Sequence, residues 1–209
     1  MIPDFTLETA ALGRGHLRIA GVDEVGRGPL AGPVMAAAVV LDPRRIPQGL
    51  NDSKKLTALA REKLNAEICA VAEVSIGHAS VEEIDSLNIL RASHLAMVRA
   101  LAGLRTAVDY ALIDGNMLPR DLEVSAEAVI KGDGRCQSIS AASIVAKYCR
   151  DRLMLSLAQQ HPGYGWETNM GYGSKSHISA LRDLGVTPHH RRSFRPVHNI
   201  LYQDVLVRP

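Results

Sequence analysis

The sequence predicts a mixed α/β protein in which a central β-sheet is flanked by helices and followed by a helical C-terminal region. Short apolar segments typical of strands alternate with longer amphipathic segments after an initial strand pair. The 209 residues fit a single domain, with a core at about 17–160 and a C-terminal region at about 161–209. The chain contains no internal repeat and no low-complexity stretch that would favour another architecture.

The first part of the chain predicts a hairpin, a helix, a strand and a second helix. Residues 17–23 and 34–41 are apolar enough for buried strands, and the Gly/Pro-rich segment GRGPLAGP between them is typical of a turn. Residues 57–72 have apolar residues at helical spacing, and residues 73–80 alternate as a half-buried strand does. Ser80–Glu83 matches a capping box, which predicts that a helix begins there.

The second part continues the alternation and then becomes helical. Residues 88–104 have strongly helical composition, and residues 109–113 and 127–130 are short apolar segments that predict strands. Residues 138–160 predict one long helix. The last fifty residues are rich in Gly, His and Arg, and we expect one helix there, at 176–184.

Charge is distributed unevenly along the chain. Residues 1–130 hold 13 Lys or Arg and 17 Asp or Glu, whereas residues 131–209 hold 11 and 5. A basic C-terminal third favours an anionic partner such as nucleic acid, although a solvated surface would look the same. No apolar run approaches the roughly 18 residues of a membrane span. Three widely spaced cysteines without a C-x-x-C motif favour a reducing, cytoplasmic compartment, and we expect a monomer.

Four acidic residues lie at or just after predicted strand ends. Asp23 and Glu24 end the first strand, Asp114 follows the strand at 109–113, and Asp133 follows the strand at 127–130. If these ends are neighbours, their repulsion, about 4 kcal/mol for two carboxylates about 4 Å apart, favours a divalent cation among them. Carboxylate oxygens select Mg²⁺ or Mn²⁺, ions suited to phosphoryl chemistry. Alternatively, Asp114 and Asp133 each precede Gly and serve only as turn formers.

The glycine-rich loop after the first strand does not match a known phosphate-binding template. Arg27 and Gly28 stand where a P-loop has Lys and Ser or Thr, and the loop leads into a strand and not a helix. Such a backbone is able to approach a ligand closely, with Arg27 beside it. A plain hairpin turn is the alternative.

Taken together, seven motifs make the sequence resemble the bacterial ribonuclease HII family of type 2 ribonucleases H. They are, in order, GVDEVGRGPLAGPV (21–34), NDSKKL (51–56), LIDGN (112–116), KGD (131–133), SISAASIVAKYCRD (138–151), MGYGSKSH (170–177) and HRRSFRPV (190–197). The resemblance implies an RNase H-like fold. It also implies cleavage of the RNA strand in RNA–DNA hybrids and nicking 5′ of single ribonucleotides in duplex DNA, for ribonucleotide removal. The expected products carry a 3′-hydroxyl and a 5′-phosphate.

The resemblance also implies roles for individual residues. One or two Mg²⁺ or Mn²⁺ ions would be held by the catalytic acids Asp23, Glu24, Asp114 and Asp133. Gly26, Arg27 and Gly28 would contact the ribonucleotide, and Tyr172 would pack on the sugar of the adjoining deoxynucleotide. From their charge, we expect basic residues to position the strands, with a solvated surface as the alternative. The candidates are Lys54, Lys147, Lys55, Lys175, Arg191 and Arg192.

Two other functions compete with this interpretation. A metal-independent ribonuclease would use histidines as acid and base, with His189 and His190 as the obvious pair, and would retain its activity in EDTA. A non-catalytic module would bind hybrids in a salt-sensitive way without cutting them. Acids at all four motif positions argue against the binding module.

Overall fold

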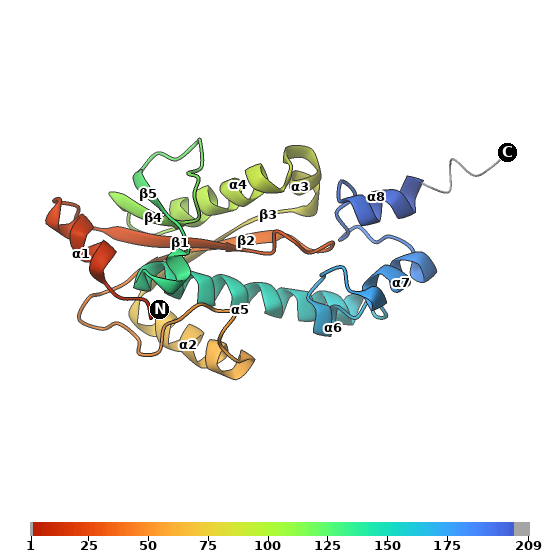
Figure 1. Cartoon of the computed structure of the whole chain (residues 1–209), viewed down its shortest axis with the longest axis horizontal. Helices are drawn as coiled ribbons and strands as arrows, with labels where there is room; N and C mark the ends of the chain where they lie inside the picture. Colours follow the sequence, from red (N-terminus) through yellow and green to blue (C-terminus); the bar gives the residue numbers. More distant parts are fainter. Residues whose placement is uncertain (1, 203–209) are drawn as a thin grey trace.

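A five-stranded mixed sheet, in the order β3-β2-β1-β4-β5, forms the centre of the computed structural model, which describes residues 2–202 (Figure 1). The strands are β1 (Ile19–Val25), β2 (Val34–Val40), β3 (Glu73–Ala79), β4 (Tyr110–Asp114) and β5 (Ser125–Val129). β2 pairs antiparallel with both β1 and β3, whereas β4 pairs parallel with both β1 and β5. The predicted mixed sheet and its opening hairpin are therefore confirmed.

The helices agree with the sequence in the core and differ at the two ends of the chain. They are α1 (Thr6–Gly13), α2 (Ala58–Val71), α3 (Val81–Leu87), α4 (Ile89–Ala102), α5 (Gln137–Gln160), α6 (Trp166–Asn169), α7 (Lys175–Leu184) and α8 (Arg195–Tyr202), with a 3-10 turn η1 at Gly132–Gly134. α1, α6 and α8 are not predicted by the sequence pattern. In the described part of the chain, no helix combines the length and apolar character needed to cross a membrane.

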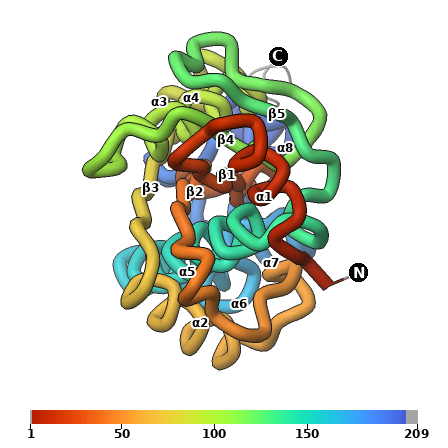
Figure 2. Tube along the Cα trace, turned by 90° about the vertical axis from the view of Figure 1, so that its left-hand side faces the viewer, coloured from red at the N-terminus to blue at the C-terminus, as the bar shows by residue number. Residues whose placement is uncertain are grey.

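Helices cover both faces of the sheet, with α3 and α4 on one face and α2 and α5 on the other (Figures 1 and 2). The alternation of β2 divides its side chains between two cores, so that Ala36 and Ala38 pack with α4 and Ala37 and Val39 pack with α5. At Gly21, an added Cβ would lie 2.1 Å from the backbone of Ser138. Glycine there allows the start of α5 to pack directly on β1.

The C-terminal region has its own core, which packs against the far end of α5 and the loop after β1. Trp166 is fully buried there, together with Leu181 and Val197, and all three lie in one cluster with Leu30 and Met154. This packing brings the C-terminal region beside the glycine-rich loop (Figure 1). Of the predicted C-terminal region, 161–209, residues 203–209 lie outside the described residues.

Candidate active site

The parallel pairing of β1 with β4 brings the predicted acids together. Val22 is registered with Ile113, so the next residues along the two strands, Asp23 and Asp114, are neighbours. Asp23 is buried on the α5 face of the sheet, and the adjacent Glu24 belongs to the opposite face because side chains alternate.

Asp133 reaches the same site from a short turn after β5. β5 ends at Val129, and Asp133 sits in the single 3-10 turn η1, which follows a left-handed residue, Lys131 (φ 55°). Within this turn, the Gly132 amide donates a hydrogen bond to Asp114 Oδ1 at 2.7 Å. Asp133 follows the last strand as predicted, with residues 130–132 between them, and its charge acts on both Asp23 and Asp114.

Burial and mutual repulsion make these carboxyl groups reluctant to ionise. Burial raises the pKa of Asp23 well above its ordinary value, and the charges of Glu24 and Asp114 raise it further. Burial also raises the pKa of Glu24, although the nearby Arg27 guanidinium opposes this shift. The pKa of Asp114 is raised by burial and partly lowered by the hydrogen bond from Gly132. A cation placed among these groups would relieve the repulsion.

The donor set suits a hard divalent cation that keeps some of its own waters. All four side chains offer carboxylate oxygens, which Mg²⁺ and Mn²⁺ prefer. Within residues 2–202, no three Asp, Glu, His or Cys side chains are arranged to enclose an ion by themselves. In a Mg²⁺ site, one or two carboxylates commonly share the ion with water and substrate phosphate.

A pair of serines orients Asp23. The Ser143 hydroxyl, on α5, lies close enough to Asp23 to lower the pKa of that carboxyl against the effect of burial, and the Glu24 amide donates to Asp23 Oδ1 at 2.7 Å. Ser143 Oγ also lies 3.0 Å from Ser53 Oγ. Either hydroxyl can be the donor in this contact. The NDSKKL segment is thereby connected to the acidic site.

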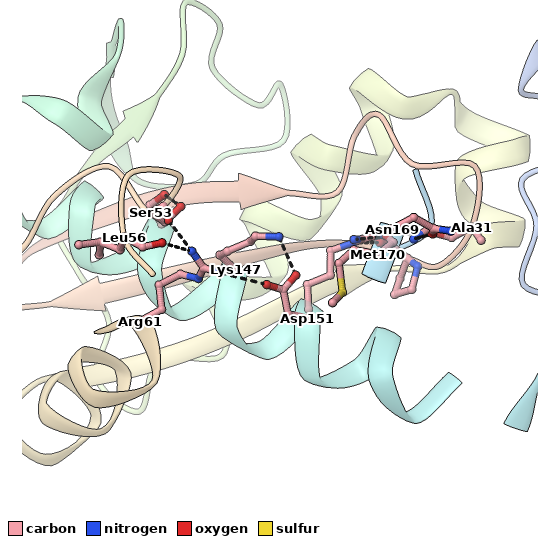
Figure 3. Close-up of polar contacts among 12 residues, drawn as sticks. Ala31, Ser53, Leu56, Arg61, Lys147, Asp151, Asn169 and Met170 are labelled. Atoms are coloured by element: carbon pink, nitrogen blue, oxygen red, sulfur yellow. Dashed lines mark hydrogen bonds and ion pairs between the residues drawn. The ribbon is translucent and has the colours of Figure 1, made fainter. Parts of the chain in front are cut away.

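The same segment is held by an ionic network on α5 (Figure 3). Arg61 donates to the carbonyls of Ser53 at 2.9 Å and Leu56 at 2.6 Å, and its guanidinium lies 3.7 Å from Asp151. Lys147 donates to the same Asp151 carboxylate at 2.7 Å. Lys147 is thus engaged in a half-buried ion pair, whereas Lys54 is exposed and its charge lowers the pKa of Asp114.

The glycine-rich loop and Tyr172 face each other beside the acids. A Cβ added to Gly28 would lie 3.3 Å from the Tyr172 ring, which is 48% exposed and available to a ligand. The loop and the Tyr172 segment are joined directly, since the Leu30 amide donates to the Gly171 carbonyl at 2.7 Å. Gly28 and Tyr172, which are both predicted to contact substrate, therefore lie side by side on the surface.

A buried arginine of α5 holds that surface together. Arg150 donates to the carbonyls of Pro33, Met170 and Ala31 at 3.0–3.1 Å, so it joins the loop after β1 to the Tyr172 segment. Figure 3 shows Ala31 and Met170 close together at this point. Burial lowers the pKa of Arg150 to about 10. Gly26 packs so tightly on this guanidinium group that an added Cβ would lie 2.1 Å from Arg150 Nε.

A second arginine corrects the sequence analysis. Arg191 was predicted to contact the substrate strands, but its side chain is fully buried and donates to carbonyls of the glycine-rich loop. It is therefore unable to reach a phosphate. The other basic candidates, Lys55, Lys175 and Arg192, are exposed.

Three buried side chains form a hydrogen-bonded series that ends at the backbone carbonyl of Tyr172. The number of protons that each side chain carries determines which atoms donate. Trp166 Nε1 donates to His177 Nε2 at 3.0 Å, so the proton of His177 is on Nδ1, which donates to the Tyr172 carbonyl at 2.9 Å. His190 Nε2 then donates to His177 Nε2 at 3.1 Å, and His190 Nδ1 accepts from the Thr187 amide at 3.0 Å. Both histidines are neutral in this arrangement.

This hydrogen-bonded series excludes the alternative in which histidines catalyse the cleavage. Burial lowers the pKa of His190 to about 3, and both of its ring nitrogens are engaged inside the protein. A general acid or base must reach the substrate and titrate near the working pH, and His190 does neither.

The buried acids at the ends of the central strands β1 and β4, beside an exposed loop and tyrosine ring, are the arrangement of a metal-dependent phosphodiester hydrolase of the RNase H-like class. A family model described as Ribonuclease HII matches residues 20–197. The chain belongs to the ribonuclease HII family, and it is a metal-dependent ribonuclease H that acts on nucleic acid.

Individual relatives agree across nearly the whole chain. Ribonuclease HII of Cereibacter sphaeroides (strain ATCC 17029) is 69% identical over 207 residues, covering 99% of this chain and 98% of the relative. Ribonuclease HII of Ruegeria pomeroyi is 71% identical, over 97% of this chain and 86% of the relative. The crystal structure of ribonuclease H2 from Pyrococcus horikoshii OT3 has a TM-score of 0.75 at 29% identity, covering 90% of this chain and 98% of that one. The predicted RNase H-like fold is therefore confirmed.

Sequence reasoning found the acids and missed the groups that hold them. Glu8 is an example, since its buried Oε1 accepts from the Ser138 amide at 2.7 Å and satisfies the start of α5. Arg150, Ser143 and His177 are further examples. Arg150, Ser143 and His177 lie within the quoted motifs, whereas Glu8 lies outside all of them. Nothing local in the sequence marks a polar residue that will be buried.

Proposed function

We propose that this ribonuclease H cleaves the RNA strand of RNA–DNA hybrids and nicks duplex DNA on the 5′ side of single embedded ribonucleotides, leaving 3′-hydroxyl and 5′-phosphate ends. The observation that carries this proposal is the packing of the glycine-rich loop against Tyr172, 3.3 Å from a Cβ added to Gly28, beside the buried acids. A site that only hydrolysed phosphodiesters would need the acids alone. The loop and ring add a surface able to read the sugar.

The acids Asp23, Glu24, Asp114 and Asp133 would hold one or two Mg²⁺ or Mn²⁺ ions. When bound, such ions stabilise charge on the phosphate and make water a better nucleophile. Asp23 is oriented for this task by Ser143, and Asp114 by the Gly132 amide. The solved structure of Bst-RNase HIII, a protein with a similar fold (TM-score 0.69), is in complex with Mn²⁺.

Recognition would be divided between the two sides of the junction. Gly26, Arg27 and Gly28 offer backbone groups, and the two glycines add no side-chain bulk, so the loop can approach the 2′-hydroxyl that alone distinguishes RNA from DNA at a given site. Tyr172 offers a flat ring that fits a deoxyribose face better than one bearing an extra hydroxyl. Lys54, exposed beside Asp114, would contact a substrate phosphate.

Lys147 has a different role in this proposal. Because it is paired with Asp151, it would act by holding the NDSKKL segment in place and only indirectly on the strand. We also propose that the protein acts as a monomer and in the cytoplasm, with residues 17–160 as core and 161–209 contributing Tyr172.

The test is a cleavage assay on a DNA duplex with one embedded ribonucleotide, run with Mg²⁺, Mn²⁺ and EDTA, with identification of the product ends. We expect a metal-dependent nick on the 5′ side of the ribonucleotide, no cleavage by Asp23→Asn, and no 2′,3′-cyclic phosphate. Tyr172→Ala should lose activity on this duplex, while Tyr202→Ala, a change at a comparably exposed tyrosine in α8, should not. Cleavage by Asp23→Asn in saturating metal would refute the assignment of the acids.

A further inference from the structure

Arg191 is a buried cation whose hydrogen-bond partners are backbone carbonyls. Its Nε donates to the Gly32 carbonyl at 2.9 Å, its Nη1 to Arg27 at 2.9 Å, and its Nη2 to Gly26 at 2.6 Å. Within residues 2–202, no Asp or Glu forms an ion pair with it. Burial lowers the pKa of Arg191 to about 9. A cation buried without a carboxylate costs free energy, so its three contacts with one loop need an explanation.

These contacts determine which way the loop amides point. Carbonyl and amide groups of one trans peptide point in opposite directions, and the described chain has no cis peptide. With the Gly26 and Arg27 carbonyls turned inward to Arg191, the amide hydrogens of Arg27 and Gly28 are turned away from it. Neither amide donates to an acceptor in the described part of the chain, and both residues are exposed. The loop thus presents two adjacent free donors beside the Tyr172 ring.

Main-chain hydrogen bonds also join the segment around Arg191 to the loop after β1. The Arg191 amide donates to the Leu30 carbonyl at 2.8 Å, and the Gly32 amide donates to the His189 carbonyl at 2.9 Å. His190 forms an isolated antiparallel bridge with Ala31. The position of the guanidinium group relative to the loop is therefore set by main-chain contacts on either side of it.

We infer that Arg191 is a positioning residue for ribonucleotide recognition, which holds the peptides of Gly26 and Arg27 so that two amide groups face the 2′-hydroxyl and the adjoining phosphate. This inference rests on the proposed role of the Gly26–Gly28 loop. A 2′-hydroxyl can accept a hydrogen bond from a fixed amide, whereas a deoxyribose leaves that donor unpaired. Rigid donors need no reorganisation on binding, so the discrimination is largest when the loop is held in place.

The experiment compares Arg191→Lys with Arg182→Lys, a change of an exposed arginine in α7. Both are made in the non-cleaving Asp23→Asn background. Fluorescence anisotropy then gives the Kd for two duplexes that differ only by one ribonucleotide or deoxynucleotide. Lysine keeps the positive charge, but a single ammonium group replaces the three guanidinium nitrogens that donate to the loop carbonyls. We expect Arg191→Lys to reduce the preference for the ribonucleotide duplex about tenfold, with little change on all-DNA duplex. Arg182→Lys should leave the preference unchanged.

A chemical rescue separates positioning from folding. In Arg191→Ala, millimolar guanidinium ion should restore the ribonucleotide preference, whereas equimolar urea, neutral and similar in shape, should not. An unchanged preference in folded Arg191→Lys, or no guanidinium rescue of folded Arg191→Ala, would overturn the inference. If the Asp23→Asn protein itself shows no ribonucleotide preference, the proposed recognition role of the loop is wrong. That result differs from a preference that is present but does not depend on Arg191, which would refute only the positioning role.

Discussion

Replacing Gly26 by alanine should destabilise the protein through two separable effects. Gly26 has φ +90°, a left-handed conformation that costs an L-residue about 1–2 kcal/mol. The new Cβ would also lie 2.1 Å from Arg150 Nε, which already donates to the Pro33 carbonyl at 3.1 Å. Moving this buried guanidinium group would cost at least one charge-assisted hydrogen bond, about 1.5–3 kcal/mol.

A matched variant isolates the second effect. Gly49 has a similar φ of +85°, but an added Cβ there meets no atom within 4 Å. Both variants gain about 0.4–1 kcal/mol because alanine restricts the unfolded chain. We therefore expect Gly26→Ala to lose about 2–4 kcal/mol of unfolding free energy and Gly49→Ala about 1 kcal/mol or less. For a chain of this size, the corresponding falls in Tm are about 5–15 °C and 2–4 °C.

Urea unfolding followed by tryptophan fluorescence measures both values. Trp166 is the sole tryptophan of the chain and is fully buried beside this region, so its emission reports on the packing that Arg150 maintains. Equal losses of stability in Gly26→Ala and Gly49→Ala would show that Arg150 does not restrict the loop. The account of how the loop is held would then be wrong.

Three further predictions concern other buried groups. The pKa of His190 is about 3 in the folded protein and 6.5 ordinarily, so as pH falls the unfolded state binds a proton first and the unfolding free energy decreases below about pH 6.5. In urea titrations, His190→Gln should reduce that decrease between pH 6.5 and 5 by about 1–2 kcal/mol. An unchanged dependence of unfolding free energy on pH would contradict the assignment of His190 as neutral. Glu8→Ala should lower the unfolding free energy by about 1–3 kcal/mol, since the Ser138 amide at the start of α5 loses its buried acceptor; a loss under about 0.5 kcal/mol would be inconsistent with this role. Ser143→Ala should reduce Mn²⁺ affinity or cleavage about 10–100-fold by releasing Asp23, whereas Ser156→Ala, on an exposed turn of the same helix, should have no effect in the same calorimetric and kinetic assays.

Patterns within short segments were enough to predict the central architecture. The strands at 17–23 and 34–41 were recognised from continuous apolar runs, and the long helix at 138–160 is observed as α5. The position of Asp23 and Asp114 at strand ends was likewise visible in the sequence, and parallel pairing then made them neighbours. Local patterns predict such features because hydrophobic periodicity and strand ends depend on residues close together in the chain.

The groups that hold the site depended on contacts between distant segments. Arg191 and Arg192 are adjacent and chemically identical, yet one is fully buried and the other is exposed. The difference arises because the carbonyl that accepts from Arg191 Nη2 belongs to Gly26, 165 residues earlier in the chain. The sequence by itself therefore determined which chemistry the protein carries and the order of its elements. Only the tertiary structure decided which polar side chains became its scaffold, since burial and hydrogen-bond partners are properties of packed segments and not of residues in isolation.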